Sequence, residues 1–157
     1  MKILTVIGAR PQFIKASPVS EKIHEAGVEE VIVNTGQHYD FNLSELFFKQ
    51  LNIPKSKYDL KVGSGTQGIQ TGEMIKRLDP ILDKEKPDLT LVYGDTNSTL
   101  AGALTSIKKQ FPIVHIEAGL RSFNKNMPEE INRLITDNLS SFLFCPSKIS
   151  ISNLKKE

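Results

Sequence analysis

The chain has little of several features that would mark a specialised class of protein. Its only cysteine is Cys145, which excludes an internal disulfide framework and is compatible with a reducing cytosol. The formal net charge of +2 is too small to indicate nucleic-acid binding, and no basic stripe interleaved with aromatic residues occurs. No apolar run approaches the roughly 20 residues that span a bilayer. We therefore expect a soluble cytoplasmic protein with neither a nucleic-acid nor a membrane partner.

We expect neither a leader sequence nor a second domain within these residues. The apolar start, MKILTVIG, is short, is followed by Arg10 and Lys15, and has no small-residue cleavage site, so it predicts a first core strand. The 157 residues correspond to about one domain. Hydrophobic residues make up 39% of the chain and charged residues 24%, which is ordinary for a globular fold.

Short apolar runs alternate with helical patterns along the whole chain. The runs predict strands at residues 3–7, 31–34, 89–93, 113–116 and 142–145, of which 3–7, 89–93 and 113–116 should be buried, with a possible short strand within 57–62. The helical patterns lie between Pro11 and Gly27 with an interruption at Pro18, at 42–51, 71–86 and 97–109, and from Pro128, with a short helix at the end. In the Pro128 helix we expect four apolar side chains to face inward: Ile131, Leu134, Ile135 and Leu139. This alternation predicts an α/β fold with a doubly wound parallel sheet.

Acidic and basic residues follow the strand at 113–116. Glu117 comes directly after the strand, where a partly buried carboxylate is costly unless it has a partner. Glu129 and Glu130 start the Pro128 helix, where the helix dipole alone would favour them by about 0.3–1 kcal/mol. Arg133 lies one turn further along and could simply pair with Glu129. The residues at the start of the Pro128 helix could therefore serve a function or could simply stabilise the helix.

Two other strand ends carry polar residues. The first, Gly8-Ala9-Arg10-Pro11 with Lys15 one turn later, offers backbone N–H groups and cations to an anion, or is a plain turn with a surface arginine. It is not a GxGxxG fingerprint, so NAD binding is not indicated. The second holds Asp95, which is either a catalytic acid or base or a helix cap. Because the carboxyl ends of parallel strands form one rim, we expect Arg10, Asp95, Glu117 and the Glu129 turn to converge there.

The remaining candidate groups are scattered. The spacing of His24, His38, His115 and Cys145 matches no metal site, and His115 is typical of a hydrogen-bonded core histidine. Gln37-His38 follows the second strand and could contact a ligand. The stretch 63–72 lacks the Lys-Ser/Thr pair of a phosphate-binding loop, so we interpret it as a mobile loop.

Five motifs together resemble one family, the non-hydrolysing UDP-N-acetylglucosamine 2-epimerases, close to the form found in archaea and some bacteria. They occur in family order along essentially the whole chain: GARPQFIK, QHY, GDTNSTLAG, HIEAGLRS and MPEEINR. The family usually has Thr where Ala9 stands and Glu where Gln12 stands, while Arg10 and Lys15 are retained. The resemblance implies that residues 1–157 are the N-terminal Rossmann-like half of a glycosyltransferase-B-type protein, and that a C-terminal UDP-binding domain lies outside this chain.

The resemblance also implies a reaction. Such enzymes interconvert UDP-GlcNAc and UDP-ManNAc by eliminating UDP to give 2-acetamidoglucal and adding it back with C2 inverted, with no cofactor and no metal. The carboxylates of this proton chemistry would be Asp95, Glu117 and Glu129. Placing acids together pushes their pKa values apart, which suits an acid/base pair.

The binding residues and partners follow from the same resemblance. Arg10, Lys15 and Arg133 would bind the substrate, and Gln37 and His38 match a motif that contacts an activating second UDP-GlcNAc in some bacterial members. The expected partners are UDP-GlcNAc or UDP-ManNAc, a C-terminal epimerase domain and a second copy in a homodimer. Without the second half, the chain alone should turn over little or no substrate. Three alternatives stay open: a non-catalytic nucleotide-sugar-binding or dimerisation module, a glycosyltransferase half, and a related 6-deoxy amino sugar as substrate.

Overall fold

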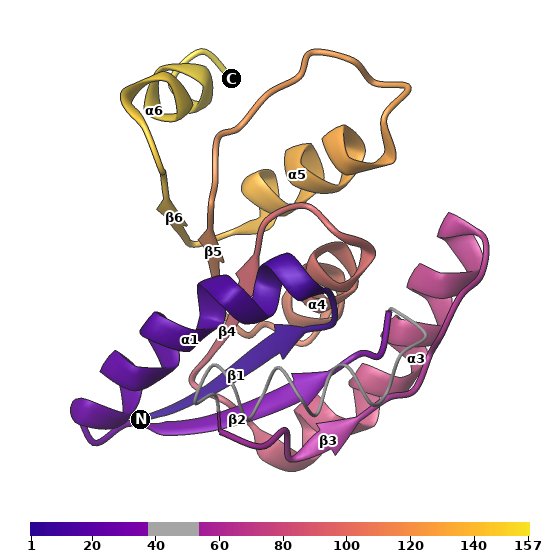
Figure 1. The fold of residues 1–157 in the computed structure, drawn as a ribbon, viewed down its shortest axis with the longest axis vertical. Helices are drawn as coiled ribbons and strands as arrows, with labels where there is room; N and C mark the ends of the chain where they lie inside the picture. The colour runs from indigo at the N-terminus through magenta and orange to yellow at the C-terminus, as the bar shows by residue number, and fades with distance from the viewer. Residues whose placement is uncertain (38–53) are drawn as a thin grey trace.

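A parallel sheet of six strands forms the centre of the molecule (Figure 1). This computed structural model describes residues 1–37 and 54–157. The strand order is β3-β2-β1-β4-β5-β6, and each observed pair is parallel. The strands are β1 (Lys2–Ile7), β2 (Glu29–Asn34), β3 (Tyr58–Asp59), β4 (Leu89–Tyr93), β5 (Ile113–Ile116) and β6 (Phe142–Phe144). The order reverses between β1 and β4, so the predicted doubly wound, Rossmann-like fold is confirmed.

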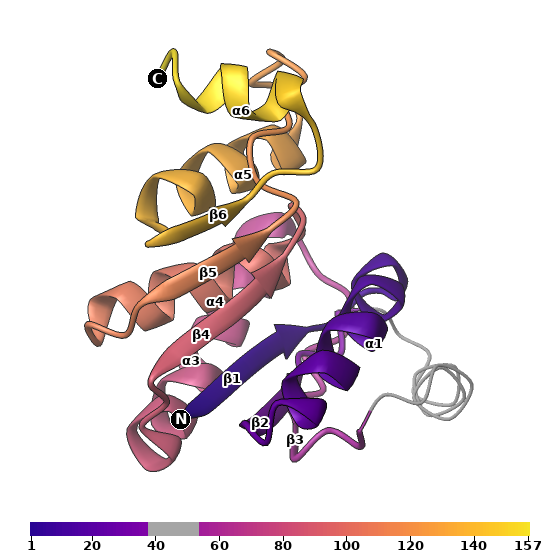
Figure 2. The same ribbon diagram turned by 90° about the vertical axis from the view of Figure 1, so that its left-hand side faces the viewer.

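Helices cover both faces of this sheet. Figure 2 shows α1 on one face and α3, α4 and α5 on the other, with α6 beyond β6. The four central strands, β2, β1, β4 and β5, contribute to both cores: Ile3 and Ile7 of β1 pack with Phe13 of α1, whereas Leu4 and Val6 pack with α3 and α4. The helices are α1 (Arg10–Glu25), α3 (Gln67–Glu85), α4 (Asn97–Lys108), α5 (Pro128–Leu139) and α6 (Lys148–Leu154). Burial on both sides explains why the strands are continuous apolar runs.

Several helix boundaries differ from the sequence predictions. Helix α1 continues through Pro18, which leaves the carbonyl of Ile14 without a helical donor. Helix α3 begins at Gln67, four residues before the predicted start, because Thr66 caps it by accepting from the N–H of Ile69 at 3.5 Å. The start of the expected mobile loop at 63–72 is therefore irregular and its end is helical. The helix predicted at 42–51 lies outside the described residues.

The predicted inward face of α5 is wrong for two of its four residues: Leu139 packs against the core and Leu134 is half-buried, but Ile131 and Ile135 face outward. Ile131 and Ile135 are 44% and 37% exposed. The buried positions of the helix are polar instead: Glu130, Asn132, Thr136 and Asp137. These four side chains face the loops at the carboxyl end of the sheet, so α5 serves the polar rim more than the apolar core. Within the described residues, no helix has both the length and the apolar character needed to cross a membrane.

Candidate active site

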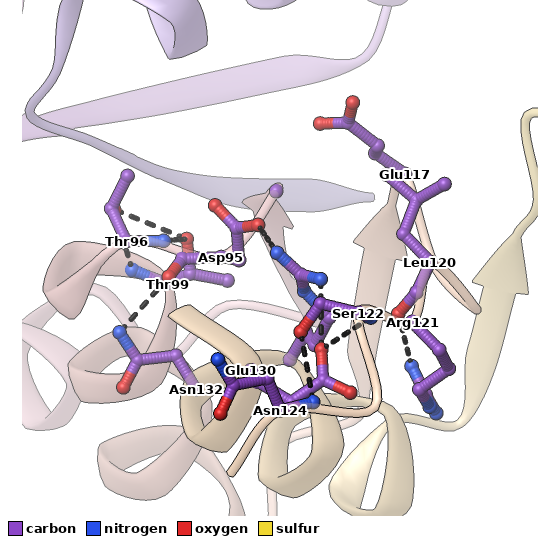
Figure 3. Close-up of polar contacts among 12 residues, drawn as sticks. Asp95, Thr96, Thr99, Glu117, Leu120, Arg121, Ser122, Asn124, Glu130 and Asn132 are labelled. Carbon is purple, nitrogen blue, oxygen red and sulfur yellow. Dashed lines mark hydrogen bonds and ion pairs between the residues drawn. The ribbon is translucent and has the colours of Figure 1, made fainter. Parts of the chain in front are cut away.

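The carboxyl ends of β1, β4 and β5 lie at one rim, and three of the predicted side chains lie together there: Lys15, Asp95 and Glu117. The register pairs Tyr93 with Ile116, so Asp95 and Glu117 follow neighbouring strand ends. A Cβ added to Gly94 would lie 3.1 Å from Glu117 Oε2 and 3.6 Å from Lys15 Nζ. The carboxylate of Glu117 and the ammonium of Lys15 therefore lie directly over the residue that precedes Asp95. Figure 3 shows Asp95 and Glu117 projecting from these neighbouring ends.

Glu117 is held in an unusual backbone conformation. Its φ is 76°, in the left-handed region that residues with a side chain rarely adopt. The N–H groups of Glu117 and Ala118 both donate to the carbonyl of Phe144 at 3.0 Å, and the carboxylate forms an ion pair with Lys15. A conformation of this kind costs about 1–3 kcal/mol and persists only where the surroundings enforce it, as they often do at functional sites. The partner expected for this carboxylate is thus Lys15, from α1.

Arg133 joins two acids at the same rim. Its guanidinium forms an ion pair with Asp95 and donates to Glu130 Oε2 at 2.8 Å, and its side chain is only 12% exposed. The pairing of Arg133 with Glu129 that the sequence left open is therefore not found: the i,i+3 partner is Glu130. Asp95 does not cap α4 either, because the cap is Thr96.

The two acids at the start of α5 have different environments. Glu130 is buried and accepts from the N–H groups of Ser122 and Phe123, each at 2.9 Å. Burial raises the pKa of Glu130, but these hydrogen bonds and the charge of Arg133 outweigh it, so the pKa lies below its usual value. Glu129 is exposed and forms no hydrogen bond or ion pair with the part of the chain that the structure describes. Glu130 thus fixes the 122–123 loop, and Glu129 stands at the helix start with its carboxylate in solvent.

Gln12 is a site residue that the sequence reasoning noted only as a departure from the family. Its carbonyl accepts from the N–H groups of Gly8 at 2.8 Å and Ala9 at 3.1 Å. Its amide donates to the Tyr93 carbonyl at 2.9 Å and approaches the Thr96 hydroxyl at 3.0 Å. This buried side chain therefore fastens the turn after β1 to the turn after β4. A buried glutamine in the first turn of a helix was the signal that could have identified it.

Replacing Gln12 with alanine should destabilise the protein by about 2–4 kcal/mol, because the N–H groups of Gly8 and Ala9 lose their buried acceptor and a cavity remains. Urea unfolding followed by circular dichroism measures this change. The matched control is Glu21→Ala, at an exposed position of the same helix, which should cost less than about 1 kcal/mol. Equal losses in the two variants would contradict the bridging role of Gln12.

The polar rim continues toward β2. Gln37 Oε1 accepts from the Ser98 hydroxyl at 2.6 Å, and Asn97 donates to Gln70 Oε1 at 2.7 Å. Asn132 of α5 donates to the Asp95 carbonyl at 2.9 Å and so connects this belt to the acids. Gln37 therefore faces the start of α4, whereas His38 lies outside the described residues. Arg10 is exposed in the first turn of α1.

Within residues 1–37 and 54–157, no group of three or more His, Cys, Asp or Glu side chains is arranged to hold a metal ion. His115 is fully buried and hydrogen-bonded, as the sequence indicated for a core histidine.

Comparison with known proteins places the chain among nucleotide-sugar epimerases. The family model described as UDP-N-acetylglucosamine 2-epimerase matches residues 21–157. A Pseudomonas aeruginosa protein named UDP-2,3-diacetamido-2,3-dideoxy-D-glucuronate 2-epimerase is 61% identical over 100% of this chain and 45% of its own length. A Methanococcus maripaludis protein named UDP-N-acetylglucosamine 2-epimerase homolog is 58% identical over 100% of this chain and 44% of its own.

A solved structure agrees with these relatives. The UDP-GlcNAc 2-epimerase of Methanocaldococcus jannaschii, in complex with UDP-GlcNAc and UDP, has a TM-score of 0.96 and 48% identity. The match covers 99% of this chain and 43% of that one, so the chain spans less than half the length of the relatives it matches. Motifs, fold and rim all agree with one assignment: the chain belongs to the UDP-N-acetylglucosamine 2-epimerase family.

Proposed function

We propose that this chain is the N-terminal half of a UDP-N-acetylglucosamine 2-epimerase and supplies its catalytic carboxylates. The complete enzyme would interconvert UDP-GlcNAc and UDP-ManNAc. The observation that carries the proposal is the convergence of two carboxylate–cation pairs at one rim. Glu117 pairs with Lys15 over Gly94. Asp95, the residue that follows Gly94, pairs with Arg133. The family match and the relatives' names support the same reaction.

The reaction requires groups on both faces of the sugar ring. A base removes the proton on C2, a double bond forms between C1 and C2, and UDP departs with the electron pair of the C1–O bond. UDP then adds back to C1 while an acid delivers a proton to the other face of C2. Asp95 and Glu117 are carboxylates on neighbouring strand ends, where they can serve opposite faces, and Glu129 is the third acid that the resemblance assigns. Lys15, Arg133 and Arg10 supply positive charge for the departing diphosphate.

The remaining part of the proposal concerns what completes the site. The relatives are more than twice as long as the matched segment. Residues 1–157 would form one domain of a two-domain enzyme, the second domain would grip the uridine and diphosphate, and neither NAD nor a metal would take part. Gln37, with His38, would contact an activating nucleotide sugar, as the resemblance implies. A cytoplasmic homodimer is the assembly we propose.

The purified chain alone should epimerise UDP-GlcNAc at a rate at least about 10³-fold below that of a joined enzyme, because half of the substrate contacts are missing. By "joined enzyme" we mean this chain fused to the C-terminal remainder of the Methanocaldococcus jannaschii relative. Proton NMR of the anomeric signals measures the conversion. Turnover by the isolated chain at a rate comparable with the joined enzyme would show that no second domain is needed. Tight UDP-GlcNAc binding by a joined enzyme that shows no conversion would favour the non-catalytic binding module.

A second substrate is favoured by the Pseudomonas aeruginosa relative, whose name specifies a UDP-2,3-diacetamido-2,3-dideoxy-D-glucuronate. Both sugars carry the 2-acetamido group and the C2 proton, so the chemistry at the rim is the same. Comparing kcat/KM of the joined enzyme for the two sugars decides between them. A ratio above about 10 in either direction corresponds to about 1.4 kcal/mol of differential transition-state binding and identifies the preferred sugar.

A further inference from the structure

A histidine and an aspartate form a buried pair directly behind the proposed catalytic carboxylates. His115 lies on β5, two residues before Glu117, and is 0% exposed. Its Nδ1 is 2.6 Å from Asp137 Oδ1 on α5, and its Nε2 is 2.7 Å from the carbonyl oxygen of Gly94 at the end of β4. The imidazole thus connects a carboxylate on one side with the turn that presents Asp95 on the other.

The partners determine how many protons the imidazole carries. A carbonyl oxygen can only accept, so Nε2 must donate to Gly94. Besides the contact with His115, Asp137 accepts two hydrogen bonds at Oδ2: one from the N–H of Gly119 at 3.0 Å and one from Arg121 Nη1 at 2.7 Å. Burial raises the pKa of Asp137, but His115, Arg121 and Gly119 outweigh that effect and hold the pKa below its usual value. Asp137 is therefore an ionised acceptor, and Nδ1 must donate as well.

The charges around this pair balance. Arg121 also pairs at 2.6 Å with Glu157, which is exposed, so the cation Arg121 and a His115 that donates from both nitrogens face two anions, Asp137 and Glu157. The titratable neighbour on the β6 side is Cys145, whose thiol pKa is raised by burial and by the charge of Asp137. Buried charges are tolerated when each cation is paired with an anion and both form further hydrogen bonds, as they do here.

The pair holds backbone on both sides of the acids. The N–H of Gly94 donates to the Ile116 carbonyl at 2.9 Å, and its carbonyl accepts from His115, so β5 binds both polar backbone groups of the residue before Asp95. Asp137 meanwhile fixes Gly119, two residues after Glu117. Loosening the pair would release the two segments that carry Asp95 and Glu117.

We propose that His115 donates from both ring nitrogens and that, with Asp137, it is a positioning residue that sets the Gly94–Asp95 turn and the Glu117–Gly119 turn for C2 chemistry. The catalytic consequence rests on the proposed epimerase function, whereas the two donated hydrogen bonds and the clamping of the two turns do not.

The donor pattern is tested on the chain as it exists by ¹⁵N NMR of histidine-labelled protein at pH 7. The expected result is that both His115 nitrogens carry a proton, with the signals assigned by their absence in His115→Gln. A His115 ring with one unprotonated nitrogen at pH 7 would overturn the proposal. This measurement needs no folded variant beyond the one used for assignment.

The positioning role is tested by Asp137→Asn, with Thr136→Val as the matched control. Thr136 is equally buried on α5, and its hydroxyl has no hydrogen-bond partner among the described residues. Asp137→Asn should shift the amide signals of Gly94, Asp95 and Gly119, and in the joined enzyme it should lower kcat for C2 exchange at least 10-fold with KM within about threefold. Thr136→Val should leave these amide signals in place and keep kcat and KM within twofold of the wild type. Equal kcat values in the two variants would overturn the positioning role. A wild-type joined enzyme without any C2 exchange would refute the epimerase proposal, and the nitrogen and amide signals would then still decide the clamp.

Discussion

Replacing Glu117 with glutamine in the joined enzyme should lower kcat for epimerisation by about 10²–10⁴-fold, the range expected when a general acid or base is lost. Glutamine keeps the size of the side chain and can still accept from Lys15, but it cannot take or deliver the C2 proton. KM should change by less than about fivefold, because Lys15 and Arg133 remain in place. Steady-state rates from the UDP-ManNAc anomeric signal measure both parameters.

The matched control for this variant is Glu73→Gln, an exposed acid on α3 that pairs with Arg77 and Lys76. It should leave kcat within twofold of the wild type. A Glu117→Gln enzyme with a normal kcat would remove Glu117 from the chemistry and leave it as a residue that merely orients Lys15.

Replacing Arg133 with methionine should cost about 3–5 kcal/mol of unfolding free energy, the loss typical of breaking a buried ion pair from one side. Glu130 is buried and would keep only the two backbone N–H donors of Ser122 and Phe123. Asp95 would lose its cation at the same time. The free energy of unfolding of the chain itself, from urea titration, measures this effect without any assay of activity.

The control is Lys76→Met, which removes an exposed cation from α3 and should cost less than about 1 kcal/mol. If the two methionine variants were equally stable, Arg133 would be a surface cation and the bridge between Asp95 and Glu130 would carry no energetic weight. In the joined enzyme, Arg133→Met should also lower kcat/KM, because it removes a positive charge from the rim.

The sequence predicted the sheet and its rim because both depend on local patterns. Strands buried on both faces are continuous apolar runs, such as residues 3–7, and the carboxyl ends of parallel strands lie at one edge whatever the packing of the helices. The neighbourhood of Asp95 and Glu117 therefore followed from the order of the strands. The partner of Glu117 did not, because Lys15 reaches it from a helix about a hundred residues earlier in the chain.

The misjudged features are those in which tertiary contacts outweigh a helical pattern. The apolar stripe of α5, with Ile131 and Ile135, looks like an inward face, but the polar stripe is the buried one because the loops before the helix need its side chains. The same contacts decide between the two adjacent acids, burying Glu130 against Ser122 and leaving Glu129 exposed. No periodicity distinguishes these outcomes, since both depend on the path of the 120–127 loop.

The central claim is that carboxylates on one rim move the hydrogen at C2 of a nucleotide sugar, and incorporation of deuterium by the joined enzyme in D₂O tests it most directly. The account predicts that UDP-ManNAc formed from UDP-GlcNAc carries deuterium at C2, and that Asp95→Asn and Glu117→Gln each block its uptake. Product that retains its original hydrogen at C2, or normal uptake of the label by both variants, would contradict the account.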